Sequence, residues 1–359
     1  MEVIFYAPLG RGIEKYKVGG AEMGCRRTLG IYEDAGFKVY CVEKAVNLGS
    51  RWRYALSFAR TYASLVAKML AHPRAVVHIV GFYDKIIDIE LLLVRTAHAL
   101  GRKVVYEIRN GSMIEVYDKR DDAYRHKQLE IFRLADGVLC QGECFVDFIK
   151  EKLGRDSFYY PNFIDDEFIS TLKPRNIDGE IRLVYFGRVA PSKNVDQVIR
   201  ATALLRRSYP GARLDIIGGV DPEYKTLLDR AVEESGLPAD AIRYHGPQSL
   251  EYIVGVLQAA HFFVFPTAYE GHSNALTEAM ACGAVPVASD VGFNASIIGD
   301  KSLVIDSLDA KDYAERMAEI LQSGQINTLS ASVQNRIISH YTRSLVAPRL
   351  TAYIRSMEK

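Results

Sequence analysis

The sequence predicts an α/β chain with two domains, each built around a parallel sheet. At 359 residues, of which 48% are hydrophobic, the chain is too long for one core and suits two domains of ordinary size. Short β-branched or aromatic runs alternate with longer segments of helical period, which is typical of βα units. The alternation breaks once, between residues 161 and 180, where two prolines and a glycine accompany several acids. We therefore expect domains at 1–165 and 166–341.

Each domain is expected to hold six strands. Those of the first domain are predicted at 3–7, 37–42, 75–80, 103–108, 137–141 and 158–160, with helices at 20–35, 52–71, 87–100, 121–135 and 143–153. Those of the second are predicted at 182–186, 213–217, 241–245, 262–265, 285–288 and 302–305. The last segment, 342–357, is amphipathic and has no strand left to pair with, so it should pack back on the first domain.

Composition limits the classes of partner. Lys and Arg number 45 against 44 Asp and Glu, so the chain lacks the global field of a nucleic-acid-coating protein, and any anion site must be local. The odd number of widely spread cysteines indicates single buried, reduced thiols and a cytoplasmic chain. They are Cys25, Cys41, Cys140, Cys144 and Cys282. Since no second ligand pair accompanies Cys140 and Cys144, we expect no metal site.

The sequence also bears on membranes. No run approaches the roughly 20 apolar residues of a spanning helix, and the first ten residues read as a strand that ends at Pro8 rather than as a leader. The segment 51–70 has an apolar face surrounded by Arg and Lys. It could lie on a membrane surface, which would place the chain peripherally at the inner face, but a helix covering a sheet is commoner and is the expectation here.

The most informative stretch is 265–286, where a strand, a loop and a helix follow one another. Ser273 or Asn274 can cap the helix, and Gly283 suits the left-handed position that ends it. Glu270 in the loop and Glu278 in the second helical turn can face one crevice, where carboxylates accept hydrogen bonds from vicinal sugar hydroxyls. The loop residues are Glu270, Gly271, His272 and Ser273. The alternatives are that the two glutamates are solvated and that His272 only fills the loop.

Cationic and glycine-rich loops supply the other candidates. Gly187, Arg188 and Lys193 lie between a strand and a helix, at the edge where parallel sheets bind ligands, and Arg and Lys suit phosphate oxygens. Gly19 and Gly20 open the first long helix and can admit an anion, or they only permit a turn. The alternative is that Arg188 and Lys193 are surface cations that bind no ligand.

Two further observations concern the first domain. Gly10 and Gly12 are followed by Lys15 where a dinucleotide fingerprint needs a third glycine, so a nicotinamide enzyme is disfavoured. Arg109 and Asn110 leave a strand at its carboxyl end, where a substrate contact and a structural role both stay open.

Together these motifs resemble glycosyltransferase family 4 over nearly the whole chain. The resemblance rests on residues 19–22, on 186–188 with Lys193, and on Glu270 to Glu278 followed by 279–283. It implies a GT-B architecture, in which two Rossmann-like domains with parallel sheets face a central cleft, and a transfer that retains anomeric configuration. Since no Asp-x-Asp triplet occurs, it implies neither a metal clamp nor a cofactor beyond the nucleotide diphosphate sugar.

The same resemblance implies residue roles. Glu270 would hold the donor sugar near its reacting carbon, Glu278 the ribose hydroxyls, and Arg188 with Lys193 the diphosphate. Gly20 would lie on the phosphate or acceptor side. Two family patterns are altered: Arg109 and Asn110 follow the strand after which members often carry His, and Ser296 occurs where they often carry Glu. These departures leave the donor sugar open.

The sequence therefore predicts a metal-independent hexosyltransferase that acts on a polysaccharide or glycolipid acceptor, of lipopolysaccharide or exopolysaccharide type. Two alternatives stay open. One is a nucleotide-sugar epimerase of the same architecture, which would need an acid/base pair and no acceptor groove. The other is a sugar-nucleotide-binding protein without turnover.

Overall fold

The structure is a computed structural model that describes residues 1–10, 19–45, 50–173, 175, 177 and 179–358. It divides into two compact units, and each is described by itself. Unit 1 comprises Met1–Asn162 with Val346–Lys359, and unit 2 comprises Phe163–Leu345. Gly12 and Lys15, which entered the dinucleotide argument, lie outside the described residues.

Unit 1 is built on a six-stranded sheet in the order β2-β1-β3-β4-β5-β6, with every pair parallel. In register, Phe5 lies beside Cys41 on one side and His78 on the other. The strands are β1 (Glu2–Ala7), β2 (Lys38–Glu43), β3 (Val76–Gly81), β4 (Val104–Ile108), β5 (Gly137–Cys140) and β6 (Phe158–Tyr159).

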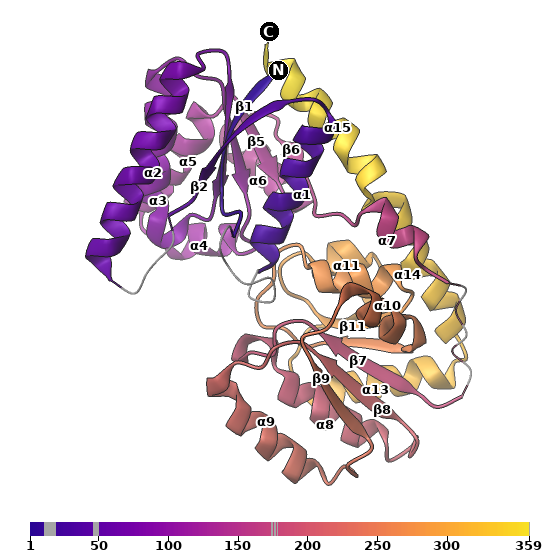
Figure 1. The fold of residues 1–359 in the computed structure, drawn as a ribbon. Helices are drawn as coiled ribbons and strands as arrows, with labels where there is room; N and C mark the ends of the chain where they lie inside the picture. The colour runs from indigo at the N-terminus through magenta and orange to yellow at the C-terminus, as the bar shows by residue number, and fades with distance from the viewer. Residues whose placement is uncertain (11–18, 46–49, 174, 176, 178, 359) are drawn as a thin grey trace. The chain divides into compact units, whose positions relative to one another are not determined.

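Helices cover both faces of the unit 1 sheet. Figure 1 shows α2 and α3 on one side and α1 and α15 on the other. The helices are α1 (Gly20–Asp34), α2 (Arg51–Ala71), α3 (Ile87–Ala99), α4 (Met113–Lys119), α5 (Asp122–Leu134), α6 (Glu143–Leu153) and α15 (Arg343–Arg355).

The last helix, α15, packs on unit 1. The ring of Tyr353 stacks on Phe158 of β6 at 4.5 Å, and Arg355 donates to the carbonyl oxygen of Ala35 at 3.1 Å. A Cβ added to Gly137 would overlap Tyr353, so the missing side chain lets the helix approach β5 closely.

Unit 2 also holds a parallel six-stranded sheet, in the order β12-β11-β10-β7-β8-β9. Its strands are β7 (Arg182–Phe186), β8 (Arg213–Ile217), β9 (Ile242–Gly246), β10 (Phe262–Phe265), β11 (Val285–Ser289) and β12 (Val304–Ile305). Its helices are α7 (Asp166–Ser170), α8 (Val195–Leu205), α9 (Pro222–Ser235), α10 (Leu250–Ala259), α11 (Asn274–Ala281), α12 (Asn294–Ile298), α13 (Ala310–Gln322) and α14 (Ile326–His340).

The strand order of each sheet reverses direction once. In unit 1 the reversal lies between β1 and β3, and in unit 2 it lies between β7 and β10. Connections that leave a sheet in opposite directions open a crevice at the carboxyl ends of the strands, where α/β proteins bind ligands. A ligand site in unit 2 is therefore expected at the loops that follow β7 and β10.

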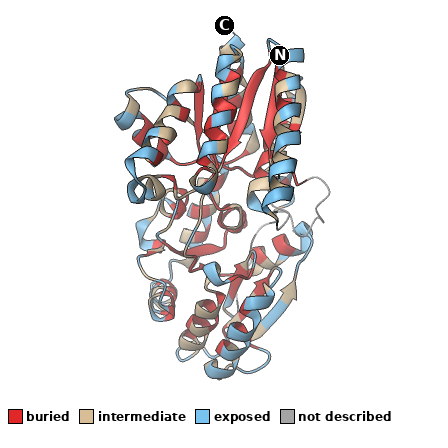
Figure 2. Cartoon of the chain, turned by 90° about the vertical axis from the view of Figure 1, so that its left-hand side faces the viewer, coloured by how far each residue is buried: buried red, intermediate tan, exposed pale blue. Residues whose placement is uncertain are grey.

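The strands form the core of each unit, and Figure 2 shows them mostly in the colour of buried residues. All residues of β3, β4, β10 and β11 are buried. Continuous burial is typical of parallel strands covered on both faces, and explains why these segments read as unbroken apolar runs. None of the described helices has both the length and the apolar character needed to cross a membrane.

The structure confirms the predicted fold class and its twelve strands, and it corrects three details. The last predicted strand begins as a 3-10 turn, Lys301–Leu303, so that β12 is confined to Val304–Ile305. Two short helices, α4 and α7, were not expected, because seven and five residues are too few to show a helical period. The thiol of Cys144 is exposed rather than buried.

Candidate functional site

The candidate site is formed by the loops that follow β7 and β10 in unit 2. Backbone hydrogen bonding joins them directly, since the amide of Ala268 donates to the carbonyl oxygen of Ser192 at 2.8 Å. Asn194 adds a second link, because its Nδ2 donates to the carbonyl oxygen of Pro266 at 2.8 Å. Asn194 adopts a left-handed conformation (φ +48°), which Asn tolerates better than most residues. The two loops therefore form one structural unit at the switch point.

Lys193 reaches from the first loop into the second. Its ammonium group forms an ion pair with Glu270 and lies 3.4 Å from both the hydroxyl of Thr267 and the carbonyl oxygen of Tyr269. It also lies 5.6 Å from the centre of the Phe265 ring, within the range of a cation–π contact. The cation is thus held in position by three residues of the opposite loop.

Glu270 is mostly buried, with 16% of its side chain exposed. Burial raises the pKa of its carboxyl group, and the neighbouring Lys193 ammonium and the Gly271 amide offset this only in part. Gly292 (φ +56°) fixes the loop from behind, because a Cβ there would overlap the carbonyl oxygen of Glu270. The loop geometry around this carboxylate therefore depends on a glycine that the sequence did not single out.

Helix α11 begins directly after the second loop. Of the two candidate caps, Ser273 and Asn274, it is the side chain of Ser273 that caps the helix, by accepting from the amide of Leu276 at 3.3 Å. Gly283 ends the segment with φ +79°, which confirms the predicted left-handed closing position. The first-turn amides of α11 carry partial positive charge, so the end of the helix beside Glu270 favours an anion.

The remaining residues of this motif are mostly enclosed. Glu278, in the second turn of α11, is 8% exposed, and His272 is 5% exposed with its ring edge-on to Tyr341 at 5.1 Å. Gly271 and Asn274 are half-buried. The structure thus places Gly271, His272, Ser273, Asn274 and Glu278 around one loop and helix start.

Arg188 occupies a different position from Lys193. Its guanidinium group is 73% exposed and makes two hydrogen bonds, of 2.9 and 2.8 Å, to the carboxylate of Asp221. No contact joins it to Lys193 or Glu270 within the described part of the chain. Sequence reasoning missed Asp221, although an acid one residue before Pro222 and shortly after the end of β8 was a readable signal of a helix start at the ligand edge.

Gly187 is needed where β7 ends. It adopts φ +139°, and a Cβ on Gly218, at φ +143°, would overlap its carbonyl oxygen. Gly187 and Gly218 follow β7 and β8, which are neighbouring strands. At this carboxyl-end edge of the sheet, the two chain segments approach each other too closely to leave room for a side chain on Gly218. Gly218 is a second residue that the sequence did not single out.

In unit 1, Gly19 and Gly20 lie at the exposed start of α1, with Gly19 as the cap residue at φ −81°. Neither adopts a positive φ, so neither is required by backbone conformation. Because both glycines are exposed, a ligand can approach their backbone closely, as the sequence suggested. The neighbouring loop is held at Leu9 and Gly10, whose amides donate to the carboxylate of Glu43 at 2.8 and 3.0 Å.

Arg109 is buried in a charged network of unit 1. Its Nε lies 2.6 Å from Glu107, and its other nitrogens donate to Asn162 and Thr28 at 3.1 Å each. On the other side of Glu107, His78 Nε2 lies at 3.0 Å. Burial raises the pKa of Glu107, but Arg109 and His78 outweigh it, so the net shift is downward. These contacts support the structural role for Arg109.

Asn110 is half-buried and shapes the turn after β4. Its side-chain oxygen accepts from the amide and hydroxyl of Ser112 at 3.2 and 2.9 Å, while its carbonyl oxygen accepts from the hydroxyl of Tyr83. The two residues for which the sequence left a substrate contact open thus differ: Arg109 is enclosed, and Asn110 is partly accessible.

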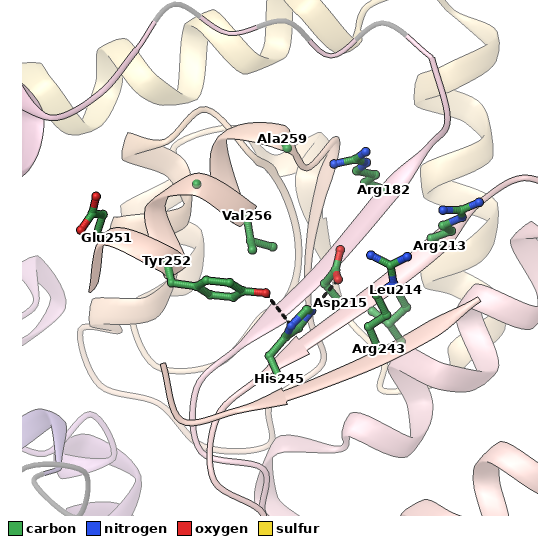
Figure 3. Close-up of a pocket in the computed structure, with 11 residues that line it drawn as sticks. Arg182, Arg213, Leu214, Asp215, Arg243, His245, Glu251, Tyr252, Val256 and Ala259 are labelled. Atoms are coloured by element: carbon green, nitrogen blue, oxygen red, sulfur yellow. Dashed lines mark hydrogen bonds and ion pairs between the residues drawn. The ribbon is translucent and has the colours of Figure 1, made fainter. Parts of the chain in front are cut away.

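A cavity of about 320 Å³ lies elsewhere in unit 2, and residues of β7, β8, β9 and α10 line it. Figure 3 shows the hydroxyl of Tyr252 directed at His245, whose opposite nitrogen meets Asp215; the two contacts are 2.8 and 2.6 Å. Arg182 and Arg213, which also line it, are the first residues of their strands. The cavity therefore lies toward the amino ends of β7 and β8, opposite the edge where such sheets bind ligands.

Comparison with known families identifies the part of the chain that carries the candidate site. Residues 169–337 match the family described as Glycosyl transferases group 1. D-inositol 3-phosphate glycosyltransferase of Mycolicibacterium smegmatis is 29% identical over 180 residues, which cover 49% of this chain and 40% of that protein. O-antigen chain mannosyltransferase B of Escherichia coli is 31% identical over 181 residues, covering 49% and 45%. The chain thus aligns with less than half the length of these relatives.

Solved structures match over almost the whole chain. Sucrose-phosphate synthase from Thermosynechococcus elongatus superposes with a TM-score of 0.78 at 16% identity and covers 99% of both chains. Anabaena HepE in complex with UDP superposes with a TM-score of 0.76 at 14% identity, covering 99% of this chain and 100% of that one. At such identities the likeness establishes the fold, which is that of GT-B glycosyltransferases. Residues 169–337, which include Lys193, Glu270 and Glu278, therefore form a glycosyl transferases group 1 domain in a chain of GT-B fold.

Proposed function

We propose that the protein is a retaining glycosyltransferase that moves a hexose-type sugar from a nucleotide diphosphate sugar to a polysaccharide or glycolipid acceptor. Residues 169–337 match a glycosyltransferase family model, and the relatives compared above are named as glycosyltransferases, one of them for O-antigen chains. These names support transfer over the alternatives of epimerisation or binding without turnover.

One observation carries the proposal: Lys193 and Glu270 meet at the switch point of the unit 2 sheet, beside the capped start of α11. A nucleotide diphosphate sugar needs a cationic surface for its phosphates next to acceptors for its sugar hydroxyls. The ammonium group and the helix start supply the first, and the carboxylate supplies the second.

The residues take distinct roles toward the donor. Lys193 binds the diphosphate, and Glu270 binds the sugar near its reacting carbon. Glu278 binds the ribose hydroxyls. Arg188 reaches the diphosphate after exchanging its contact with Asp221, which costs little because an exposed ion pair is worth roughly 0–1 kcal/mol. Gly20, at the start of α1 in unit 1, is assigned a role toward the phosphate or the acceptor.

The reaction breaks the bond between the anomeric carbon and the diphosphate oxygen and forms a bond to an acceptor hydroxyl oxygen. Positive charge develops at the anomeric carbon, and the departing diphosphate gains negative charge that Lys193 and the start of α11 stabilise. The acceptor proton passes to the leaving phosphate. Each charge-assisted hydrogen bond to that phosphate contributes about 1.5–3 kcal/mol.

Since these groups take up the phosphate charge, the proposed reaction needs no metal ion. The direct check is to add a chelator to the assay, which should leave the rate unchanged. A rate restored only by a divalent cation would contradict this part of the proposal.

The test of the function is a transfer assay with a panel of nucleotide diphosphate sugars and glycan or lipid-linked acceptors. The UDP and UDP-glucose complexes of HepE make these two compounds natural first probes. We expect nucleoside diphosphate release that depends on an acceptor, and a product whose anomeric coupling, read by NMR, matches the donor. Conversion of the donor sugar without release would favour the epimerase, and an inverted product would contradict retention.

A further inference from the structure

Helix α2 presents an apolar stripe on its outward face. The buried residues of the helix are Leu65 and Met69. Opposite them, six exposed side chains follow one another every three or four residues, within an arc of about 80° at 3.6 residues per turn. They are Trp52, Leu56, Ala59, Ala63, Ala67 and Leu70. The largest of them, Trp52, Leu70 and Leu56, are 86%, 62% and 56% exposed.

The outer face of α2 departs from the usual pattern of a surface helix. A helix that covers a sheet directs its apolar residues inward and its polar residues outward. In α2 the inner face does rest on unit 1, as the sequence predicted, but the outer stripe contains no polar residue. An apolar stripe of this length on both faces indicates that the outer one has a partner.

The charges of α2 narrow the choice of partner. The helix carries Arg51, Arg53, Arg60 and Lys68, and no Asp or Glu. No ion pair joins these four cations to any residue that the structure describes. Arg53 and Arg60 lie along one border of the stripe, about 80–100° around the helix from Trp52. A partner that accepts the stripe must therefore also accept uncompensated positive charge.

We propose that α2 is the docking surface of this protein for a membrane rich in anionic phospholipids. The stripe would enter the boundary between headgroups and acyl chains, with the Trp52 ring at the interface, while the cations meet lipid phosphates. A second copy of the chain fits less well, since pairing two such stripes would bring eight cations together without a carboxylate on either helix. The proposal rests on α2 alone and is independent of the proposed function.

The chain offers its own reporter, because Trp52 is the sole tryptophan. The purified full-length protein is mixed with vesicles of phosphatidylcholine alone or of phosphatidylcholine with phosphatidylglycerol, and binding is followed by flotation and by tryptophan emission. We expect flotation only with the anionic vesicles, a shift of the emission to shorter wavelength, and loss of both at high salt. Quenching by bromine-labelled acyl chains should show that the indole enters the bilayer surface.

Variants distinguish membrane binding through the stripe from nonspecific binding through any exposed apolar residue. The double variant Leu56→Glu/Leu70→Glu keeps Trp52 and alters only exposed positions, so it should melt as the wild type does. It should partition at least about tenfold more weakly, since it replaces buried apolar area with like charge to the lipid. The matched control, Leu92→Glu/Leu227→Glu, changes leucines that are 43% and 46% exposed on other helices and should bind normally.

Three results would overturn the proposal. The first is the absence of binding to anionic vesicles by folded wild-type protein. The second is equal binding by the stripe variant and the control variant. The third is a mass and a Trp52 emission that change with protein concentration in the absence of lipid, which would assign the stripe to a second copy of the chain.

Discussion

Lys193 and Glu270, separated by 77 positions in the sequence, form an ion pair that joins the loop after β7 to the loop after β10. The pair is enclosed, with 20% and 16% of the two side chains exposed. Its partners lie at the point where the strand order of the unit 2 sheet reverses. The candidate site is thus defined by topology as well as by residue type, and this position leads to several predictions.

The first prediction concerns the charge state of Glu270. Burial already raises the pKa of this carboxyl group, and Lys193 opposes that effect. In Lys193→Met the opposing cation is absent, so the pKa of Glu270 should rise further. The carboxylate would also lose its hydrogen-bond partner, so the protein should lose about 1–3 kcal/mol of stability. Carbon NMR of labelled glutamate should show the shift.

The pH dependence of stability follows from the direction of this shift. A carboxyl group with a raised pKa in the folded state binds protons more tightly there than in the unfolded chain. Glu270 therefore lowers stability as pH rises from the ordinary value of 4.5 through its raised pKa. In Lys193→Met this loss should extend to higher pH. Lys311→Met, which removes an exposed lysine, is the control and should keep the pH profile of the wild type. If Lys193→Met also kept that profile, the Lys193–Glu270 pair would not set the charge state of Glu270.

The second prediction concerns Gly292, which supports Glu270 from behind. In Gly292→Ala, the alanine must keep a left-handed backbone conformation, and its Cβ would also overlap the carbonyl oxygen of Glu270. Gly236 is a matched control, because it has a similar φ of +63° and open space around its Cβ position. We expect Gly236→Ala to cost roughly 1–2 kcal/mol through conformation alone. Gly292→Ala should cost more and should also lose nucleotide-sugar binding.

Calorimetry with and without ligand separates these effects. If both glycine variants lose the same stability and bind the donor equally, the overlap with Glu270 has no functional consequence. A binding defect confined to Gly292→Ala would show that the position of the loop carbonyl matters to the site.

The third prediction concerns the exposed Arg188 and its half-buried partner Asp221. If the guanidinium group exchanges Asp221 for the diphosphate, Arg188→Ala should weaken donor binding by roughly tenfold or more. Asp221→Asn should maintain or strengthen binding, because it frees the cation. Titration of both variants with UDP, with Arg200→Ala as the exposed control, measures this directly. Equal weakening by both variants would indicate that the Arg188–Asp221 pair acts as a structural unit instead.

The fourth prediction concerns the buried charges of unit 1. Glu107 has a lowered pKa because Arg109 and His78 outweigh the effect of burial. It should therefore stabilise the fold above its ordinary pKa of 4.5 and lose that contribution as pH falls through the lowered value. Glu107→Gln leaves Arg109 buried without its counter-charge and should cost about 3–5 kcal/mol at neutral pH.

Urea unfolding between pH 3 and 7 tests this expectation, with pH values chosen to span the ordinary carboxyl range. The variant should be less stable than the wild type at neutral pH, and its curve should fall less steeply in acid. Glu130→Gln, which alters a surface pair with Arg95, serves as control and should change little. Equal curves for the two variants would show that the buried network contributes no special stability.

Much of the fold could be predicted from the sequence because parallel strands are buried on both faces. Segments such as Phe262–Phe265 therefore read as apolar runs whose limits coincide with the observed strand. The Ser273 cap and the Gly283 ending were also readable, since each depends on residues within one turn.

What could not be predicted depends on contacts between distant segments. The enclosure of Arg109 requires Asn162 and Thr28, which are 53 and 81 positions away, and only the fold brings them together. The pairing of Arg188 with Asp221 likewise joins the ends of two neighbouring strands. Sequence motifs thus placed these residues at the carboxyl ends of the strands, where the structure has them, without giving the state of each side chain there.

The central claim is that Lys193, Glu270 and Glu278 bind the nucleotide diphosphate sugar, and thermal unfolding with a panel of nucleoside diphosphates and their sugars tests it most directly. Ligand at about one hundred times its dissociation constant should add about 2.7 kcal/mol to stability. We expect one nucleotide to stabilise the wild type and the exposed control Glu234→Ala, but not Lys193→Ala or Glu278→Ala. Equal stabilisation of every variant would place the nucleotide elsewhere, and no stabilisation of folded wild-type protein by any member of the panel would contradict the account.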